Sequence, residues 1–83
     1  MKILVTGGAG FIGSYLCEEL VKRNISISVW DNLFRGNMDN IRHLLNDTNR
    51  FFNIDLSDSK NIEQMVALLL EEKPRYIFHY AAI

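Results

Sequence analysis

Apolar and polar residues follow two different periods along this chain, and together these periods predict four strands and three helices. Lys2–Thr6 is a short, largely apolar run that ends at glycine, as in a strand buried on both faces. Residues 25–30 alternate between apolar and mostly polar side chains, which is the period of a strand. Apolar runs at residues 50–54 and 75–80 predict two further strands. Each gap between successive strands is long enough for a helix.

The three gaps carry the spacing of helices. After Gly10, the side chains of Ile12, Leu16 and Leu20 recur on one stripe, and a shorter helix is predicted over residues 38–45. The third helix begins with side-chain oxygens that can cap it, carries an amphipathic repeat and ends at a proline. These residues are Ser57, Asp58 and Ser59 for the cap, Ile62, Met65, Val66, Leu69 and Leu70 for the repeat, and Pro74 for the end.

This alternation of strands and helices is typical of an α/β protein with a parallel sheet. With right-handed crossovers, the first three strands spread in one direction. If the order follows that of a Rossmann-type three-layer dinucleotide-binding sheet, the fourth strand returns to the other side of the first. The first two helices then cover one face and the third covers the other, so the fourth strand is an exposed apolar edge. We therefore expect residues 1–83 to form only the first βαβαβαβ portion, the N-terminal part of a dinucleotide-binding domain.

Composition narrows the class of protein further. Apolar residues make up 48% of the 83 residues, and nine basic side chains against ten acidic ones leave a net charge of −1. This balance gives no electrostatic reason to expect a nucleic acid or an anionic membrane as partner. No apolar run approaches a membrane span, no signal peptide is evident, and the single cysteine, Cys17, favours a reducing, cytoplasmic setting.

The candidate chemistry lies in the glycines that follow the first strand. Gly7 allows a sharp reversal of the chain, Gly10 removes a side chain where a phosphate would approach the backbone, and Gly13 allows the next helix to pack closely on the strand. The free N–H groups of the first helical turn then face the anion. The alternative is a purely structural turn, because glycine turns are common.

An acidic residue at the end of the second strand favours the binding interpretation. Asp31 lies 18 positions after Gly13, where a carboxylate can accept hydrogen bonds from the adenosine ribose and repel a 2′-phosphate. Arg35 complicates this choice, because a guanidinium there could bind a 2′-phosphate. Since Asp31 is present, the sequence predicts NAD rather than NADP.

Four blocks of residues together resemble the extended short-chain dehydrogenase/reductase family, in particular its NAD-dependent nucleotide-sugar epimerases, dehydratases and decarboxylases. In order, the blocks are Thr6-Gly7-Gly8-Ala9-Gly10-Phe11-Ile12-Gly13-Ser14, then Asp31-Asn32-Leu33 with Arg35-Gly36, then Asp55-Leu56, then His79-Tyr80-Ala81-Ala82. They match in order and spacing across the whole chain, which is specific for the superfamily and weak for any one member.

The resemblance implies a set of cofactor contacts. The backbone amides of Phe11 and Ile12 would meet the pyrophosphate. Asp31 would hold the ribose beside a loop that runs from Asn32 to Gly36, in which Asn32, Leu33, Arg35 and Gly36 are the expected contacts. Asp55 and Leu56 would border the adenine, and Tyr80, Ala81 and Ala82 would line the cofactor near its nicotinamide half.

Several of these residues have simpler structural interpretations. Asp55 could merely lead into the following helix and favour its dipole, and Ala81 with Ala82 could be tight packing alone. His79 is predicted to be a packed histidine of a buried strand rather than a base. Cys17 is predicted to do no more than pack a helix.

The residues that would perform the family's chemistry are not present in this sequence. The family uses a tyrosine followed four positions later by a lysine, which lowers the pKa of the phenol. The positions four residues after Tyr15 and Tyr76 hold Glu19 and Tyr80, so no catalytic residue is assigned, and no metal site is predicted. No Lys-Ser or Lys-Thr follows the glycines, which excludes a kinase-type phosphate loop.

Two functions stay open at this point. The first is the NAD-binding portion of a nucleotide-sugar epimerase or dehydratase, with the catalytic and substrate-binding parts absent and a homodimer as the plausible assembly. The second is a non-catalytic dinucleotide-binding module, such as a redox sensor or an inactive fragment.

Overall fold

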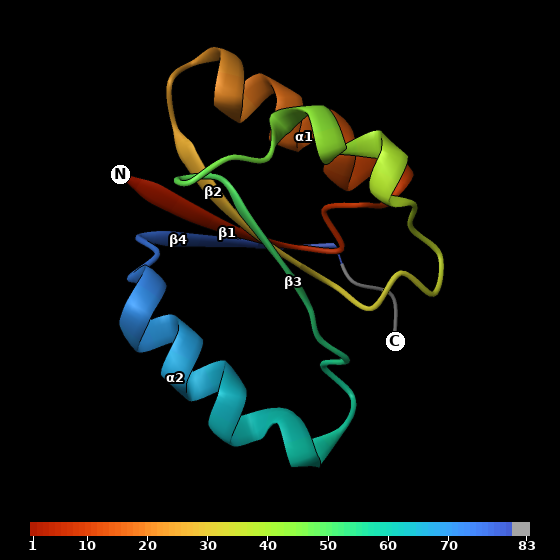
Figure 1. Cartoon of the computed structure of the whole chain (residues 1–83), viewed down its shortest axis with the longest axis vertical. Coiled ribbons are helices and arrows are strands. Elements are labelled where there is room, and N and C mark those ends of the chain that lie inside the picture. Colours follow the sequence, from red (N-terminus) through yellow and green to blue (C-terminus); the bar gives the residue numbers. More distant parts are fainter. Residues whose placement is uncertain (81–83) are drawn as a thin grey trace.

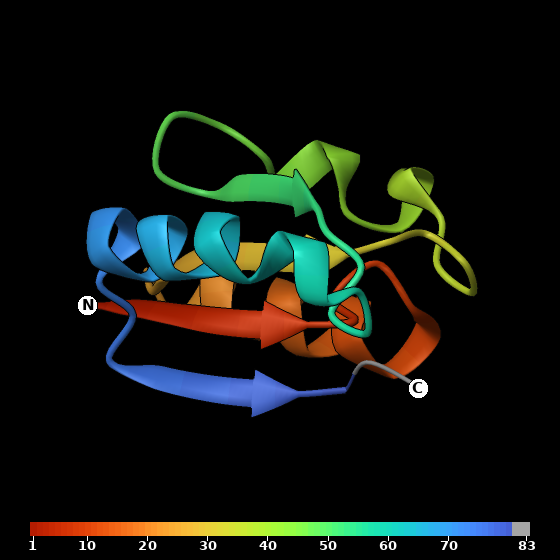
Figure 2. The same cartoon turned by 90° about the horizontal axis from the view of Figure 1, so that it is seen from below.

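A computed structural model describes residues 1–80, which form a parallel four-stranded sheet with helices on both faces (Figures 1 and 2). In chain order the elements are β1 (Lys2–Thr6), α1 (Phe11–Lys22), β2 (Ser26–Asp31), the 3-10 turns η1 (Met38–Asn40) and η2 (Arg42–Leu44), β3 (Arg50–Asn53), the 3-10 turn η3 (Ser59–Asn61), α2 (Ile62–Glu72) and β4 (Tyr76–His79). The strand order β3-β2-β1-β4 confirms the predicted Rossmann-type topology.

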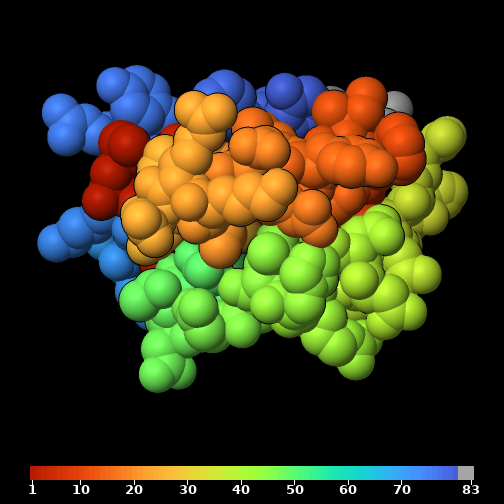
Figure 3. All heavy atoms as spheres, turned by 90° about the horizontal axis from the view of Figure 1, so that it is seen from above, coloured from red at the N-terminus to blue at the C-terminus, as the bar shows by residue number. Residues whose placement is uncertain are grey.

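The sheet is buried from both sides in its centre, which explains the apolar run of β1. On one face α1 and the 38–50 segment cover the strands, as Figure 3 shows, and α2 crosses the other face (Figure 1). Successive β1 residues enter opposite layers, because Leu4 packs with Trp30, Ile54 and Leu68 of the α2 layer. The α1 layer is the larger core and contains Ile3, Val5, Ala9, Cys17, Leu20, Ile27, Val29 and Ile41.

The buried face of α1 differs from the predicted stripe. Of the three predicted residues only Leu20 is buried; Leu16 is half-buried and Ile12 is exposed, while Gly13 and Cys17 face the sheet. The helix is rotated in this way because Gly13 has to pack against the glycine turn. The packing prediction for Cys17 is confirmed, and burial raises the pKa of its thiol to about 12, so the thiol stays protonated.

The helix predicted over residues 38–45 is replaced by two separate 3-10 turns. Ile41 separates η1 from η2 with φ −130°, which is outside the helical range, and its side chain is fully buried. Burial of this one side chain in the α1 layer therefore outweighs the continuity of a helix.

The apolar repeat of α2 is only partly used among the described residues. Of the five predicted positions only Met65 packs on the sheet, together with the buried Leu68, which the prediction did not include. The other four predicted positions are exposed: Ile62, Val66, Leu69 and Leu70. The predicted exposed edge is confirmed, since all four residues of β4 are exposed. His79 is therefore not a packed core histidine, and that prediction is wrong because no described element covers β4.

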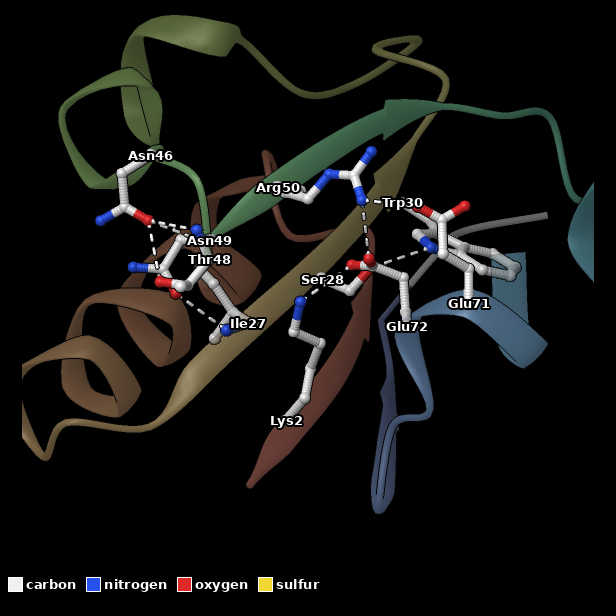
Figure 4. Close-up of polar contacts among 10 residues, drawn as sticks. All are labelled: Lys2, Ile27, Ser28, Trp30, Asn46, Thr48, Asn49, Arg50, Glu71 and Glu72. Carbon is white, nitrogen blue, oxygen red and sulfur yellow. Dashed lines mark hydrogen bonds and ion pairs between the residues drawn. The ribbon is translucent and has the colours of Figure 1, made fainter. Parts of the chain in front are cut away.

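A buried carboxylate connects α2 to two strands at the amino ends of the sheet (Figure 4). The side chain of Glu72 is 4% exposed, and its carboxylate oxygens lie 3.1 Å from Lys2 Nζ and 3.0 Å from Arg50 Nη1. Glu71 also pairs with Arg50, but its side chain is 59% exposed. Glu72 thus joins the end of α2 to the start of β1 and of β3.

Replacing Glu72 by glutamine should lower the free energy of unfolding by about 2 kcal/mol, because the buried carboxylate would no longer form charge-assisted hydrogen bonds with Lys2 and Arg50. Urea denaturation measures this change. Glu71→Gln is the matched control and should change the midpoint little, since exposed ion pairs contribute little to stability. Equal effects of the two substitutions would contradict the structural role given to Glu72.

Candidate functional site

A pocket of about 620 Å³ lies where the carboxyl ends of the parallel strands meet. Ligands bind at this edge in open α/β sheets, at the point where the strand order reverses. Its lining comes from four places, which are the turn after β1, the end of β2 with its loop, the segment after β3 and the residue after β4. The residues are Gly7, Gly10, Phe11, Ile12, Gly13, Trp30, Asp31, Asn32, Phe34, Arg35, Gly36, Ile54, Asp55, Leu56, Ser57 and Tyr80.

Two glycines of the turn are required by the backbone itself. Gly7 has φ 72°, a region that favours glycine, and its N–H continues the sheet by donating to Trp30 O at 2.8 Å. A Cβ on Gly13 would lie 2.2 Å from Gly7 O, which no packing adjustment accommodates. A Cβ on Gly10 would meet only Gly7 O, at 3.2 Å. Gly10 therefore has room for a Cβ within the protein, and it also lines the pocket.

The first turn of α1 presents unpaired donors to this pocket. Among the described residues, the N–H groups of Phe11, Ile12 and Gly13 donate no hydrogen bond, and the N-cap Gly10 has no side chain to cap them. The first turn also contains no acidic residue. With the helix dipole, this arrangement suits an anion and needs no basic side chain.

Asp31 lies beside this turn and is 8% exposed. Its Oδ2 accepts a hydrogen bond from Ala9 N at 3.0 Å, and its Oδ1 accepts one from Leu33 N at 2.8 Å. Each carboxylate oxygen can accept a further hydrogen bond. Asp31 can therefore organise the backbone around it and still accept hydrogen bonds from a ligand in the pocket.

In the loop after β2, some residues line the pocket and one packs into the core. Leu33 adopts φ 63°, and its side chain packs against the α1 layer instead of lining the pocket. Phe34 is 75% exposed and lines the pocket with Asn32, Arg35 and Gly36. An Asx turn, in which Phe34 N donates to Asn32 Oδ1 at 3.0 Å, shapes this part of the loop.

At the far end of the pocket, Asp55 participates in a turn that leads toward α2. Its Oδ1 accepts hydrogen bonds from Ser57 Oγ at 2.6 Å and from Ser57 N at 2.9 Å. These bonds, the hydroxyl first, hold the pKa of Asp55 below its ordinary value. The carboxylate thus has a structural use in this turn, several residues before α2 begins at Ile62, and it also lines the pocket.

Replacing Ser57 by alanine should raise the pKa of Asp55 toward its ordinary value, because both the hydroxyl donor and the turn it stabilises are weakened. NMR titration of the carboxyl carbon measures this. A lowered pKa stabilises the folded protein above the pKa of the unfolded chain, and this contribution is lost as the pH falls through the folded-state pKa. Ser59→Ala is the control, since Ser59 makes no hydrogen bond to Asp55.

The last strand brings one more predicted residue to the site. Tyr80 lines the pocket, and its N–H donates to Thr6 O at 2.8 Å. His79 Nδ1 shares a hydrogen bond with Thr6 Oγ1, which ties β4 to the residue before the glycine turn. Ala81 and Ala82 lie outside the described residues.

Comparison with known proteins decides the family. The profile of the NAD dependent epimerase/dehydratase family matches residues 3–83. The chain belongs to this family. The match confirms the resemblance to the extended short-chain dehydrogenases/reductases that the four sequence blocks carry.

Individual epimerase/dehydratase family members agree with this assignment. The UDP-glucose 4-epimerase of Bacillus subtilis is 34% identical over 86 aligned positions, covering 100% of this chain and 24% of that protein. The structure of UDP-glucose 4-epimerase with UDP-glucose from Thermotoga maritima has a TM-score of 0.83 and 39% identity, over 99% of this chain and 24% of that one. The structure of dTDP-glucose 4,6-dehydratase with NAD from Bacillus anthracis has a TM-score of 0.87 and 30% identity, over 100% and 27%. The chain spans about a quarter or less of the length of the curated relatives it matches.

Four residues that line the pocket of this chain were not among the predicted contacts: Trp30, Phe34, Ile54 and Ser57. Two of them had a signal in the sequence, because Trp30 and Ile54 fall at or beside the carboxyl ends of strands, where such sites form. Phe34 lies inside the predicted loop, but nothing in its neighbourhood distinguishes an exposed aromatic from a buried one. Ser57 could only be read as a capping residue.

Proposed function

We propose that this chain is the NAD-binding part of an enzyme that acts on a nucleotide sugar. The observation that carries the proposal is the set of unpaired N–H groups of Phe11, Ile12 and Gly13, which open into a pocket flanked by Asp31. Membership of the epimerase/dehydratase family supports it, as does the NAD in the Bacillus anthracis dehydratase.

The residues present fit this cofactor. The volume of about 620 Å³ is in the range of cofactor sites. The helix N-terminus can bind the pyrophosphate, Asp31 can accept from the ribose hydroxyls, and Asp55 with Leu56 can border the adenine. Arg35 is the basic side chain among the pocket-lining residues. NAD, when bound, supplies the hydride chemistry, and these residues hold and orient it.

For the whole protein, we propose oxidation of a sugar carbon of a nucleotide sugar, followed by epimerisation, dehydration or decarboxylation. The presence of UDP-glucose in the Thermotoga maritima structure supports a nucleotide sugar as substrate. The acid–base residues for this reaction would come from a Tyr-x-x-x-Lys motif outside residues 1–83, as would the residues that bind the sugar.

The remaining proposals concern setting and assembly. The free and fully buried Cys17 supports a reducing, cytoplasmic compartment. We propose a homodimer as the assembly of the full-length protein. We propose no nucleic-acid or membrane partner, and the net charge of −1 supports the absence of a nucleic-acid partner. Across residues 1–80, no helix has the length and apolar character needed to traverse a lipid bilayer.

The first test is isothermal titration calorimetry of the full-length protein with NAD, NADP and ADP. The second is to read the coding sequence that follows codon 83. We expect NAD to bind more tightly than NADP, and a Tyr-x-x-x-Lys motif to follow. NAD binding without this motif would favour the non-catalytic dinucleotide-binding module. If neither NAD nor NADP binds, the proposed site is refuted.

A further inference from the structure

Ala9, in the middle of the glycine turn, is held by hydrogen bonds at both its N–H and its carbonyl. Its N–H donates to Asp31 Oδ2 at 3.0 Å. Its carbonyl accepts from Asn37 N at 3.0 Å and from Asn40 Nδ2 at 2.8 Å. All three partners belong to the 31–40 segment, which contains the loop beside the proposed ribose site.

The carbonyl of Ala9 belongs to the peptide unit that precedes Gly10, the N-cap residue of α1. The N–H of the same unit, that of Gly10, donates to Gly7 O at 3.1 Å. This peptide unit is therefore fixed at both ends by three hydrogen bonds. Such fixation matters here because Gly10, on one side of this peptide unit, leaves the backbone freer to rotate than another residue would. A peptide flip would exchange an N–H for a carbonyl near the anion site.

The direction of this carbonyl suits an anion in the pocket. Ala9, Asn37 and Asn40 do not line the pocket, whereas Gly10 and Phe11 do. The Ala9 carbonyl is thus directed toward Asn37 and Asn40, which lie outside the lining of the pocket. A carbonyl left without these donors would be free to rotate toward a bound phosphate and repel it.

The contact between the two segments is close as well as polar. A Cβ on Gly36 would lie 2.9 Å from Ala9 C and 2.9 Å from Asp31 Oδ2. The loop backbone therefore rests directly on the Ala9 peptide. Asn40 follows in η1, whose N-terminus is capped when Asn37 Oδ1 accepts from Asp39 N at 2.9 Å, and the fully buried Ile41 anchors the next position.

We infer that Asn40 is a positioning residue for pyrophosphate binding. Its amide donates to the Ala9 carbonyl and so keeps the glycine turn in the conformation that presents the α1 N–H groups to the cofactor. Asn40 acts through the turn and touches no ligand. This inference rests on the proposed NAD site.

The test compares the Asn40→Asp variant of the full-length protein with the unchanged full-length protein. Calorimetric titration measures the affinity for NAD and ADP, and NMR titration measures the affinity for adenosine. The aspartate has nearly the same shape but no donor for the Ala9 carbonyl. We expect affinity for NAD and ADP to fall about tenfold, and affinity for adenosine, which has no phosphate, to change less than about twofold. Asn40→Ala, which adds no charge, should weaken NAD binding about fivefold and serves if Asn40→Asp does not fold.

Asn46→Asp is the matched control. Asn46 uses its side-chain oxygen as an acceptor, from Thr48 and Asn49, so aspartate preserves these bonds while adding the same charge. Its NAD affinity should equal that of the unchanged protein. Equal loss in both aspartate variants, equal loss for adenosine and ADP, or no loss in Asn40→Asp overturns the inference. Failure of the unchanged protein to bind NAD overturns the proposed function instead.

Discussion

Gly13→Ala is expected to disrupt the glycine turn and abolish NAD binding. The added Cβ would lie 2.2 Å from Gly7 O and 2.9 Å from Gly8 Cα, and both are backbone atoms that no rotamer change can move. The turn or the whole of α1 has to shift, at a cost of about 3 kcal/mol or more. Thermal denaturation followed by circular dichroism measures the loss of stability, and titration with NAD measures binding.

Gly10→Ala separates the effect of a side chain on NAD binding from its effect on the stability of the fold. Its Cβ meets only Gly7 O, at 3.2 Å, so the fold should tolerate the substitution with a small change in melting temperature. NAD affinity should nevertheless fall about 100-fold, ~2.7 kcal/mol, because the methyl group occupies the side from which the phosphate approaches. A stable Gly10→Ala protein with unchanged affinity would place the pyrophosphate elsewhere, and a stable Gly13→Ala protein would contradict the packing described.

Local features of this site were predictable because each depends on a few neighbouring residues. The reversal at Gly7 needs a positive φ that glycine favours, and the observed φ of 72° agrees. Right-handed crossovers account for β1, β2 and β3 lying in one direction across the sheet, and the dinucleotide-binding strand order places β4 on the other side of β1. Together they bring Asp31 and Asp55 to the same pocket as the turn. Alternation, glycine spacing, handedness and the known dinucleotide-binding strand order are enough for this part.

The orientation of the helices was not predictable from apolar spacing alone. Ile12 belongs to the apolar stripe of α1, yet it is exposed and lines the pocket, because contact of Gly13 with Gly7 sets the rotation of the helix. Similarly, the buried Ile41 interrupts the helix expected over residues 38–45. Tertiary packing of a single residue outweighs local propensity in both cases.

The polar contacts that organise the site depend on residues far apart in the sequence. Asn40 and Ala9 are separated by 31 positions, and Asn40 follows no motif that would single out its amide. Lys2 and Glu72 are 70 positions apart. Such pairs become visible only when the sheet order and the helix rotations are known together.

Asp31→Ala is expected to weaken NAD and NADP alike, although removal of a carboxylate beside the ribose would by itself favour NADP. The reason is that both oxygens already accept backbone hydrogen bonds, from Ala9 and Leu33. Loss of these charge-assisted bonds should cost about 2–3 kcal/mol of stability and loosen the loop against the turn. Urea denaturation and titration with both dinucleotides measure the two effects.

Asp31→Asn isolates the contribution of charge to cofactor choice. The amide oxygen keeps an acceptor for one of the two N–H groups, while the charge that would repel a 2′-phosphate is gone. The ratio of NADP affinity to NAD affinity should therefore rise about tenfold, ~1.4 kcal/mol, even as NAD binding weakens. Combining Asp31→Asn with Arg35→Ala should remove this gain, because Arg35 lines the same pocket and is the group able to pair with the phosphate. An unchanged ratio of NADP affinity to NAD affinity in Asp31→Asn would mean that the carboxylate organises the backbone but does not distinguish a ribose hydroxyl from a 2′-phosphate.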